Sequence, residues 1–146
     1  MAWIADTNVL VYRFDPRFPA KQGIATRLLR EGLASGDCRV PHQAIVEFVS
    51  VVTKPLRPDG RVLLSREDAC REAEDLMAQF PILLPTESLV RLALRGWIAY
   101  GLSWFDAQMW ACAEHYGARA LYSEDFQHDR LYGSVRAVNP FLPPAP

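Results

Sequence analysis

The sequence has little of what marks several classes of protein. It holds three cysteines, Cys38, Cys70 and Cys112, an odd number with no CxxC spacing. Neither a disulfide framework nor a thiolate zinc site is therefore expected, and a reducing cytoplasm is the expected location. No apolar run reaches the roughly 18 residues that span a bilayer, and the first residues do not have the pattern of a signal peptide.

The chain also lacks an excess of positive charge. Sixteen basic residues stand against seventeen acidic ones, for a formal net charge of −1. Bulk charge therefore gives no sign of a nucleic-acid partner, and any basic surface must be local. Lysine is scarce, because fourteen of the sixteen basic residues are arginine. Arginine favours planar, two-point contacts with carboxylate or phosphate groups.

The length and the apolar content are those of one globular domain. Of the 146 residues, 50% are hydrophobic and 23% are charged, which is usual for such a domain. We expect residues 1–140 to form this domain. Residues 141–146 are rich in proline and are expected to form an extended tail.

Short apolar runs alternate along the chain with segments of helical periodicity. Strands are predicted at residues 2–5, 38–40, 81–85, 118–123 and 135–138. Helices are predicted at 20–35 and 42–54, and after the capping residues Ser65, Thr86 and Ser103. This alternation predicts an α/β fold with a parallel sheet and right-handed crossovers.

Two acids lie just past the ends of predicted strands. Asp6 comes after the first strand and Asp125 after the fourth. If those strands are neighbours, both carboxylates lie in one crevice at the carboxyl ends of the strands, where such sheets bind ligands. The alternatives are structural: Asp6 is also a good helix N-cap, and Asp125 is also a residue of an ordinary polar turn.

Two further acids lie on predicted helices. Glu47 is the only acid in the apolar segment AIVEFVSVV and either faces water or faces a cleft. Asp106 forms an S-x-x-D capping box with Ser103, which does not prevent its carboxylate from also reaching a crevice. Crowded carboxylates repel one another unless a cation neutralises them. Together the four acids indicate a site for Mg²⁺ or Mn²⁺, which prefer oxygen ligands.

At these residues the chain resembles the PIN-domain ribonucleases, especially the VapC-type toxins of toxin–antitoxin pairs. The matching segments are IADTNVLVY, PHQAIVEF, SWFDAQMWACAEHYG, LYSEDF and VRAVNPF, in the order typical of the family. The resemblance implies a PIN-like three-layer sandwich, with a five-stranded parallel sheet and helices on both faces. It also implies a metal-dependent endoribonuclease that cuts RNA phosphodiesters, a cognate antitoxin protein and a homodimer.

The resemblance assigns roles position by position. It implies that four acids are catalytic and bind the metal, and that two polar residues support them. Glu124 and Asp129 leave the last acid position open. The four acids are Asp6, Glu47, Asp106 and Asp125, and the supporting residues are Asn8 and Ser123.

Basic residues cluster on and after the helix that carries Glu47. Lys54, Arg57 and Arg61 either belong to a solvated loop or form a rim that contacts RNA phosphates. Trp97 and Tyr100 either pack within the fold or contribute to a dimer face.

Two other functions compete with the nuclease interpretation. A haloacid-dehalogenase-like phosphatase also uses an aspartate after the first strand, but it requires a second aspartate where this chain has Asn8. A non-catalytic RNA-binding or interaction module could use the same fold, although the presence of all four acids argues against it.

Overall fold

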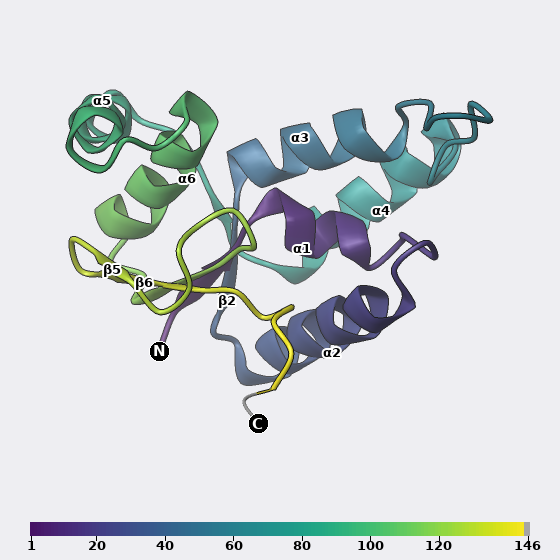
Figure 1. The fold of residues 1–146 in the computed structure, drawn as a ribbon, viewed down its shortest axis with the longest axis horizontal. Coiled ribbons are helices and arrows are strands. Elements are labelled where there is room, and N and C mark those ends of the chain that lie inside the picture. Colours follow the sequence, from purple (N-terminus) through teal and green to yellow (C-terminus); the bar gives the residue numbers. More distant parts are fainter. Residues whose placement is uncertain (145–146) are drawn as a thin grey trace.

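A computed structural model describes residues 1–144 of the chain. Its centre is a six-stranded sheet with the strand order β3-β2-β1-β4-β6-β5 (Figure 1). All neighbouring strands are parallel except β5 and β6. The strands are β1 (Trp3–Ala5), β2 (Cys38–Pro41), β3 (Ile82–Leu83), β4 (Ala120–Tyr122), β5 (Leu131–Tyr132) and β6 (Val135–Val138).

The prediction of a parallel α/β sheet is confirmed, but the count of five strands is wrong by one. The additional strand, β5, is antiparallel to β6 and joined to it by Gly133 and Ser134. Gly133 has a φ of 61°, a backbone conformation that suits glycine in such a turn. Two residues are too few to show the alternating pattern of a strand, so β5 has no recognisable signal in the sequence.

Helices cover both faces of the sheet. α1 to α4 lie on one side and α5 and α6 on the other (Figure 1). The predicted caps are in place, since Ser65, Thr86 and Ser103 each accept a hydrogen bond from a backbone N–H three residues on. The helices are α1 (Thr7–Tyr12), α2 (Pro19–Ser35), α3 (His42–Val52), α4 (Arg66–Gln79), α5 (Glu87–Tyr100) and α6 (Trp104–His115).

The core lies between the sheet and the helices. Ile4, Val40 and Leu121 are fully buried on three adjacent strands, and Phe48 of α3 is fully buried in the same core cluster. α5 and α6 approach closely at Gly96, where an added Cβ would lie 2.2 Å from the Trp110 ring. A side chain at this position would separate the two helices, so glycine is required there.

The connections place one end of the sheet where a site is expected. From β1 the chain moves outward through β2 to β3, and it then returns to β4 on the other side of β1. The carboxyl ends of β1 and β4 are therefore neighbours, and the Asp6 N–H donates to the Tyr122 carbonyl at 3.0 Å. This is the point in an open α/β sheet at which ligands bind.

Part of the predicted tail packs against the domain. The Phe141 ring contacts the Tyr12 ring with centroids 4.9 Å apart, whereas residues 145–146 lie outside the described residues. Cys38, Cys70 and Cys112 are free thiols. Within residues 1–144, no helix combines the length and the apolar character needed to cross a membrane.

Candidate active site

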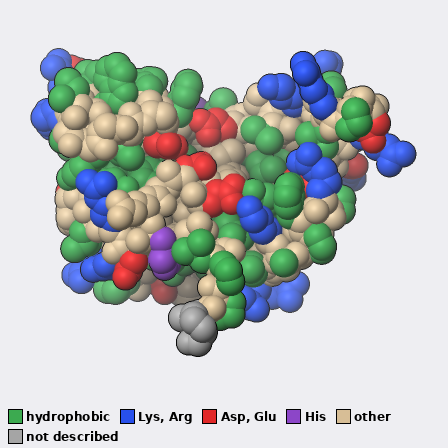
Figure 2. Space-filling view, viewed as in Figure 1, with side chains coloured by type: hydrophobic (Ala, Val, Ile, Leu, Met, Phe, Trp, Pro, Cys, Tyr) green, Lys and Arg blue, Asp and Glu red, His purple; other side chains and the backbone are tan. Residues whose placement is uncertain are grey.

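Three of the predicted acids meet at the carboxyl edge of the sheet. Asp6 follows β1, Asp125 follows β4 and Asp106 lies in the first turn of α6. One carboxylate oxygen from each lies within 4.8 Å of the others. Acidic side chains gather around a hollow near the middle of the face drawn in Figure 2. Segments separated by about 100 residues thus contribute to one acidic group.

Asp6 is the buried member of this group, with 4% of its surface exposed. One carboxylate oxygen accepts the Thr7 N–H and the other accepts the Ser123 O–H, both at 2.6 Å. Burial, with a smaller contribution from the charges of Asp125 and Asp106, raises the pKa of Asp6 to about 7 although these two hydrogen bonds lower it. A buried carboxylate of this kind is costly to ionise unless a cation lies beside it.

Asp106 and Asp125 are partly buried and have raised pKa values. Burial is the main cause for both, and the charge of Glu47 raises both further. The predicted capping box is present, because the Asp106 N–H donates to the Ser103 Oγ at 3.2 Å. This bond fixes the first turn of α6 and leaves the Asp106 carboxylate free to join the acidic group.

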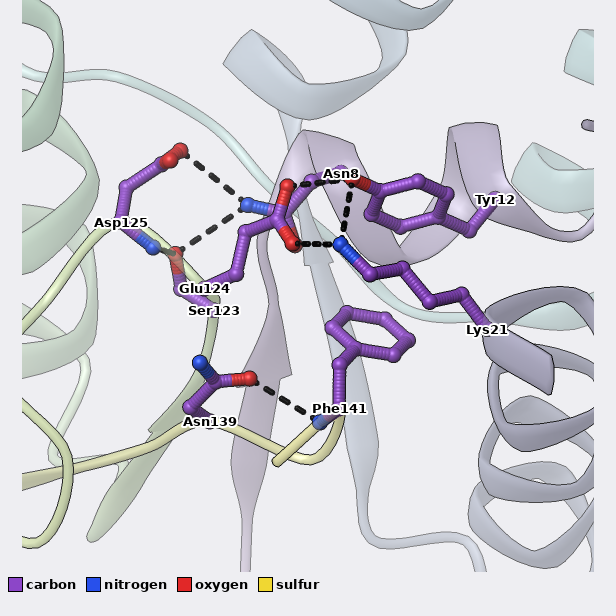
Figure 3. A network of polar contacts seen from close by, with 8 residues as sticks. All are labelled: Asn8, Tyr12, Lys21, Ser123, Glu124, Asp125, Asn139 and Phe141. Carbon is purple, nitrogen blue, oxygen red and sulfur yellow. Dashed lines mark hydrogen bonds and ion pairs between the residues drawn. The ribbon is translucent and has the colours of Figure 1, made fainter. Parts of the chain in front are cut away.

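The predicted supporting residues link the two strand ends. The Ser123 Oγ donates to Asp6 and accepts the Asp125 N–H at 3.0 Å. The Asn8 Nδ2 donates to Asp125 at 3.1 Å and to Ser123 at 3.3 Å (Figure 3). The Asn8 Oδ1 is buried and has no hydrogen-bond partner among the described residues. The three carboxylates, together with this unpaired oxygen on a side chain that contacts Asp125, fit a site for a hard cation that prefers oxygen ligands.

Glu47 lies beside this group and is held by its own contacts. Its Oε2 accepts the Thr7 hydroxyl at 2.6 Å, and its Oε1 accepts the Gln43 amide at 3.0 Å. The Gln43 amide also donates to the Phe105 carbonyl at 3.0 Å, which ties α3 to α6. Sequence reasoning missed both holding residues. The i, i+4 spacing of Gln43 and Glu47 was the available signal for Gln43.

Two acids whose role the sequence left open have other partners. Glu124 accepts the Tyr12 hydroxyl at 2.6 Å and the Lys21 ammonium at 2.9 Å (Figure 3). Asp129 pairs with Arg136 at 3.1 Å. Neither is among the three acids that meet at the sheet edge, although the charge of Glu124 raises the pKa of Asp125.

The predicted basic residues lie apart from the acidic group. Lys54, Arg57 and Arg61 are all exposed and belong to the segment that follows α3. In Figure 1 this segment lies at the end of α3 that is farther from β2. Arg61 is 3.5 Å from Asp59 in an exposed ion pair. The structure therefore brings the acids together, but it does not place these three cations beside them.

The chain matches the PIN domain over residues 4–134. A likeness of fold is found in the solved structure of the VapC20 toxin of Mycobacterium tuberculosis, which is described as cleaving the sarcin–ricin loop. The TM-score is 0.62 at 18% sequence identity, over 85% of this chain and 90% of that chain. No curated protein matches the sequence. Because the match to the domain spans most of its length, the chain belongs to the PIN-domain family.

Proposed function

We propose that this protein is a metal-dependent endoribonuclease that acts in the cytoplasm as the toxin of a toxin–antitoxin pair. The observation that carries the proposal is the meeting of Asp6, Asp106 and Asp125 within 4.8 Å at the carboxyl edge of the sheet. The PIN-domain match and the fold shared with an RNA-cleaving toxin support the choice of RNA as the substrate.

Asp6, Asp106 and Asp125 would hold Mg²⁺ or Mn²⁺, with Glu47 completing the acidic site. The raised pKa of Asp6 and the unpaired oxygen of Asn8 support this assignment. A nearby cation would lower the cost of ionising the buried carboxylate and would give the unpaired oxygen a partner. When bound, such an ion activates water at neutral pH and stabilises the charge on a phosphoryl oxygen.

The protein's own residues fix the geometry of this site. Ser123 and the Thr7 N–H hold Asp6 by one oxygen each, and Asn8 holds Asp125. The Thr7 hydroxyl also donates to Glu47, so this one residue orients both Asp6, which follows β1, and Glu47 of α3. The hydrogen bonds to Asp6 and Asp125 favour the charged forms of these two acids, which the chemistry requires.

The antitoxin and a second copy of the chain are the proposed protein partners. An apolar groove of about 240 Å³ lies between α3, α5 and α6 and includes Val46 and Phe105, which are 55% and 63% exposed. On α5, Ile98 is 83% exposed and Trp97 is 45% exposed. Several large apolar side chains exposed on one part of the surface support contacts with other proteins. Tyr100 packs on Trp110 and Tyr132 instead.

The decisive experiment is cleavage of total RNA by the purified protein. We expect cleavage with Mg²⁺ or Mn²⁺, none in EDTA, and none by Asp125→Asn. Asp68→Asn serves as the matched control, since this exposed acid on α4 pairs with Arg71 away from the site. RNA that stays intact with wild-type protein and either ion would refute the proposal and favour a non-catalytic binding module.

A further inference from the structure

A second pocket opens next to the acidic group. It has a volume of about 340 Å³ and runs from Glu47 and Asp125 to the loop between α1 and α2, where Arg17 and Phe18 lie. This volume is within the range of about 300 to 1,000 Å³ that small ligands occupy. Because Asp125 and Asn8 belong both to this pocket and to the acidic site, an occupant would be adjacent to the reacting phosphodiester.

One cation lines this pocket among the described residues, and a buried acid fixes it. Asp15 is 2% exposed, and its two oxygens accept the Arg17 Nε–H at 2.9 Å and an Nη2–H at 2.8 Å. The Arg17 backbone N–H also donates to Asp15 at 3.1 Å. These bonds use two of the five donors of the guanidinium. Arg17 lines the pocket and its side chain is 50% exposed, so donors remain for an occupant.

The charges around the pocket explain why a fixed cation is useful there. Four acids line it: Asp15, Glu47, Glu124 and Asp125. Arg17 neutralises Asp15, and Lys21 neutralises Glu124 at 2.9 Å. An RNA strand that enters must still pass close to Glu47 and Asp125, which repel its phosphates. A guanidinium with a planar set of donors matches the geometry of a phosphate.

The walls of the pocket suit the rest of a nucleotide. Phe18 is 43% exposed, and the Arg17 guanidinium lies 5.4 Å from the centre of its ring. Tyr12 lies on the same side, with its ring 5.7 Å from that of Phe18. The Phe18 ring can contact a base without requiring a particular sequence, whereas Lys21 and Phe141 lie against the Tyr12 ring.

We propose that this pocket binds the RNA nucleotide next to the cleaved bond, with Arg17 contacting its phosphate and Asp15 acting as the positioning residue for Arg17. The inference rests on the proposed function, since it concerns the substrate of the same site. It adds a substrate-binding residue that lies outside the acidic group and outside the basic segment after α3.

The test compares Arg17→Ala, Arg17→Lys and Asp15→Asn with wild type. A short single-stranded RNA of randomised sequence is titrated at several salt concentrations with Ca²⁺ in place of Mg²⁺, and kcat and KM are measured with Mg²⁺. We expect Arg17→Ala to raise Kd and KM about five- to tenfold while kcat changes by less than about twofold. Its salt slope should fall by about 0.7, the value for one phosphate contact on a single strand.

The other variants separate the charge of Arg17 from its position. Arg17→Lys should keep the salt slope, and Asp15→Asn should raise KM with the slope kept, because both retain a cation. Arg91→Ala is the matched control and should behave as wild type, since it breaks an exposed arginine–carboxylate pair on α5. If Arg17→Ala does not fold, Arg17→Gln keeps a donor for Asp15 and takes its place.

The inference would be overturned if Arg17→Ala had the Kd and salt slope of wild type. It would also be overturned if Arg91→Ala lost as much RNA affinity as Arg17→Ala. RNA binding by wild type too weak to measure would overturn it as well, because the pocket would then have no affinity for a nucleotide. Cleavage by wild type tests the proposed function separately. A wild type that cuts RNA with unaltered KM in Arg17→Ala refutes only the pocket assignment.

Discussion

At the scale of single residues, Asp6 has two possible roles that one substitution separates. As a cap, Asp6 is replaced by asparagine at little cost, because asparagine caps about as well. As a metal ligand, it loses its charge in Asp6→Asn while it keeps its shape. We expect RNA cleavage to fall by orders of magnitude with the fold intact. Near-wild-type cleavage by folded Asp6→Asn protein would contradict the catalytic role.

The pH dependence of stability gives a second measure of the same substitution. In the folded protein the pKa of Asp6 is raised to about 7 from 3.8. The folded state therefore holds this proton more tightly than the unfolded chain. This favours folding below about pH 4, and the contribution is lost as the pH rises towards 7. In EDTA, the melting temperature of wild type should fall relative to that of Asp6→Asn over this interval. Parallel melting curves at every pH would contradict the expectation.

Thr7 holds Glu47, a role that sequence reasoning missed. Its hydroxyl donates to Glu47 at 2.6 Å from a position that is 8% exposed. Thr7→Val keeps the shape but leaves Glu47 without this donor, and a hydrogen bond to a charged group contributes about 1.5 to 3 kcal/mol. We expect kcat to fall about tenfold or more. Thr7→Ser keeps the hydroxyl and should retain most of the activity; an equal loss in both variants would point to packing instead.

At the scale of elements, the sequence predicts what has a local cause. Ser65, Thr86 and Ser103 mark three helix starts that the structure places within one residue. α1 is predicted only through the alternative role of Asp6 as a helix N-cap, because its six residues, TNVLVY, give no contrast between an apolar and a polar face. β3 is limited to Ile82–Leu83 instead of the predicted 81–85, since it pairs with β2 alone at the edge of the sheet.

The candidate site can likewise be predicted only where the cause is local in the sequence. Asp6 and Asp125 can be found because each follows a strand and the neighbouring position of β1 and β4 brings them together. The hydrogen bonds from Thr7 to Glu47, from Gln43 to Phe105 and from Tyr12 to Glu124 cannot be found, because they join segments whose distance and orientation depend on packing over the whole domain. A sequence offers no direct measure of either.

The basic segment after α3 is an element whose role stays a prediction. Its cations are exposed and lie away from the acidic group, so only a strand that extends past the active site would reach them. If RNA follows this path, Arg57→Ala with Arg61→Ala should flatten the salt dependence of RNA binding by about 0.7 for each phosphate that is no longer bound. The melting temperature should change little. A salt slope equal to that of wild type would assign the RNA path elsewhere.

At the scale of the whole molecule, the acidic site couples metal binding to folding. The folded chain brings together three carboxylates that the unfolded chain keeps apart, so an ion binds the native state and stabilises it by mass action. At an ion concentration of about 100 times Kd this amounts to about 2.7 kcal/mol. For a domain of this size, each kcal/mol raises the melting temperature by about 2–4 °C.

We therefore expect Mg²⁺ or Mn²⁺ to raise the melting temperature of the wild type by several degrees. In Asp6→Asn most of this rise should be lost, and NaCl of equal ionic strength should not reproduce it in wild type. An equal rise in both proteins would mean that the ions act on general surface charge, and the acidic group would then lose its support as a metal site.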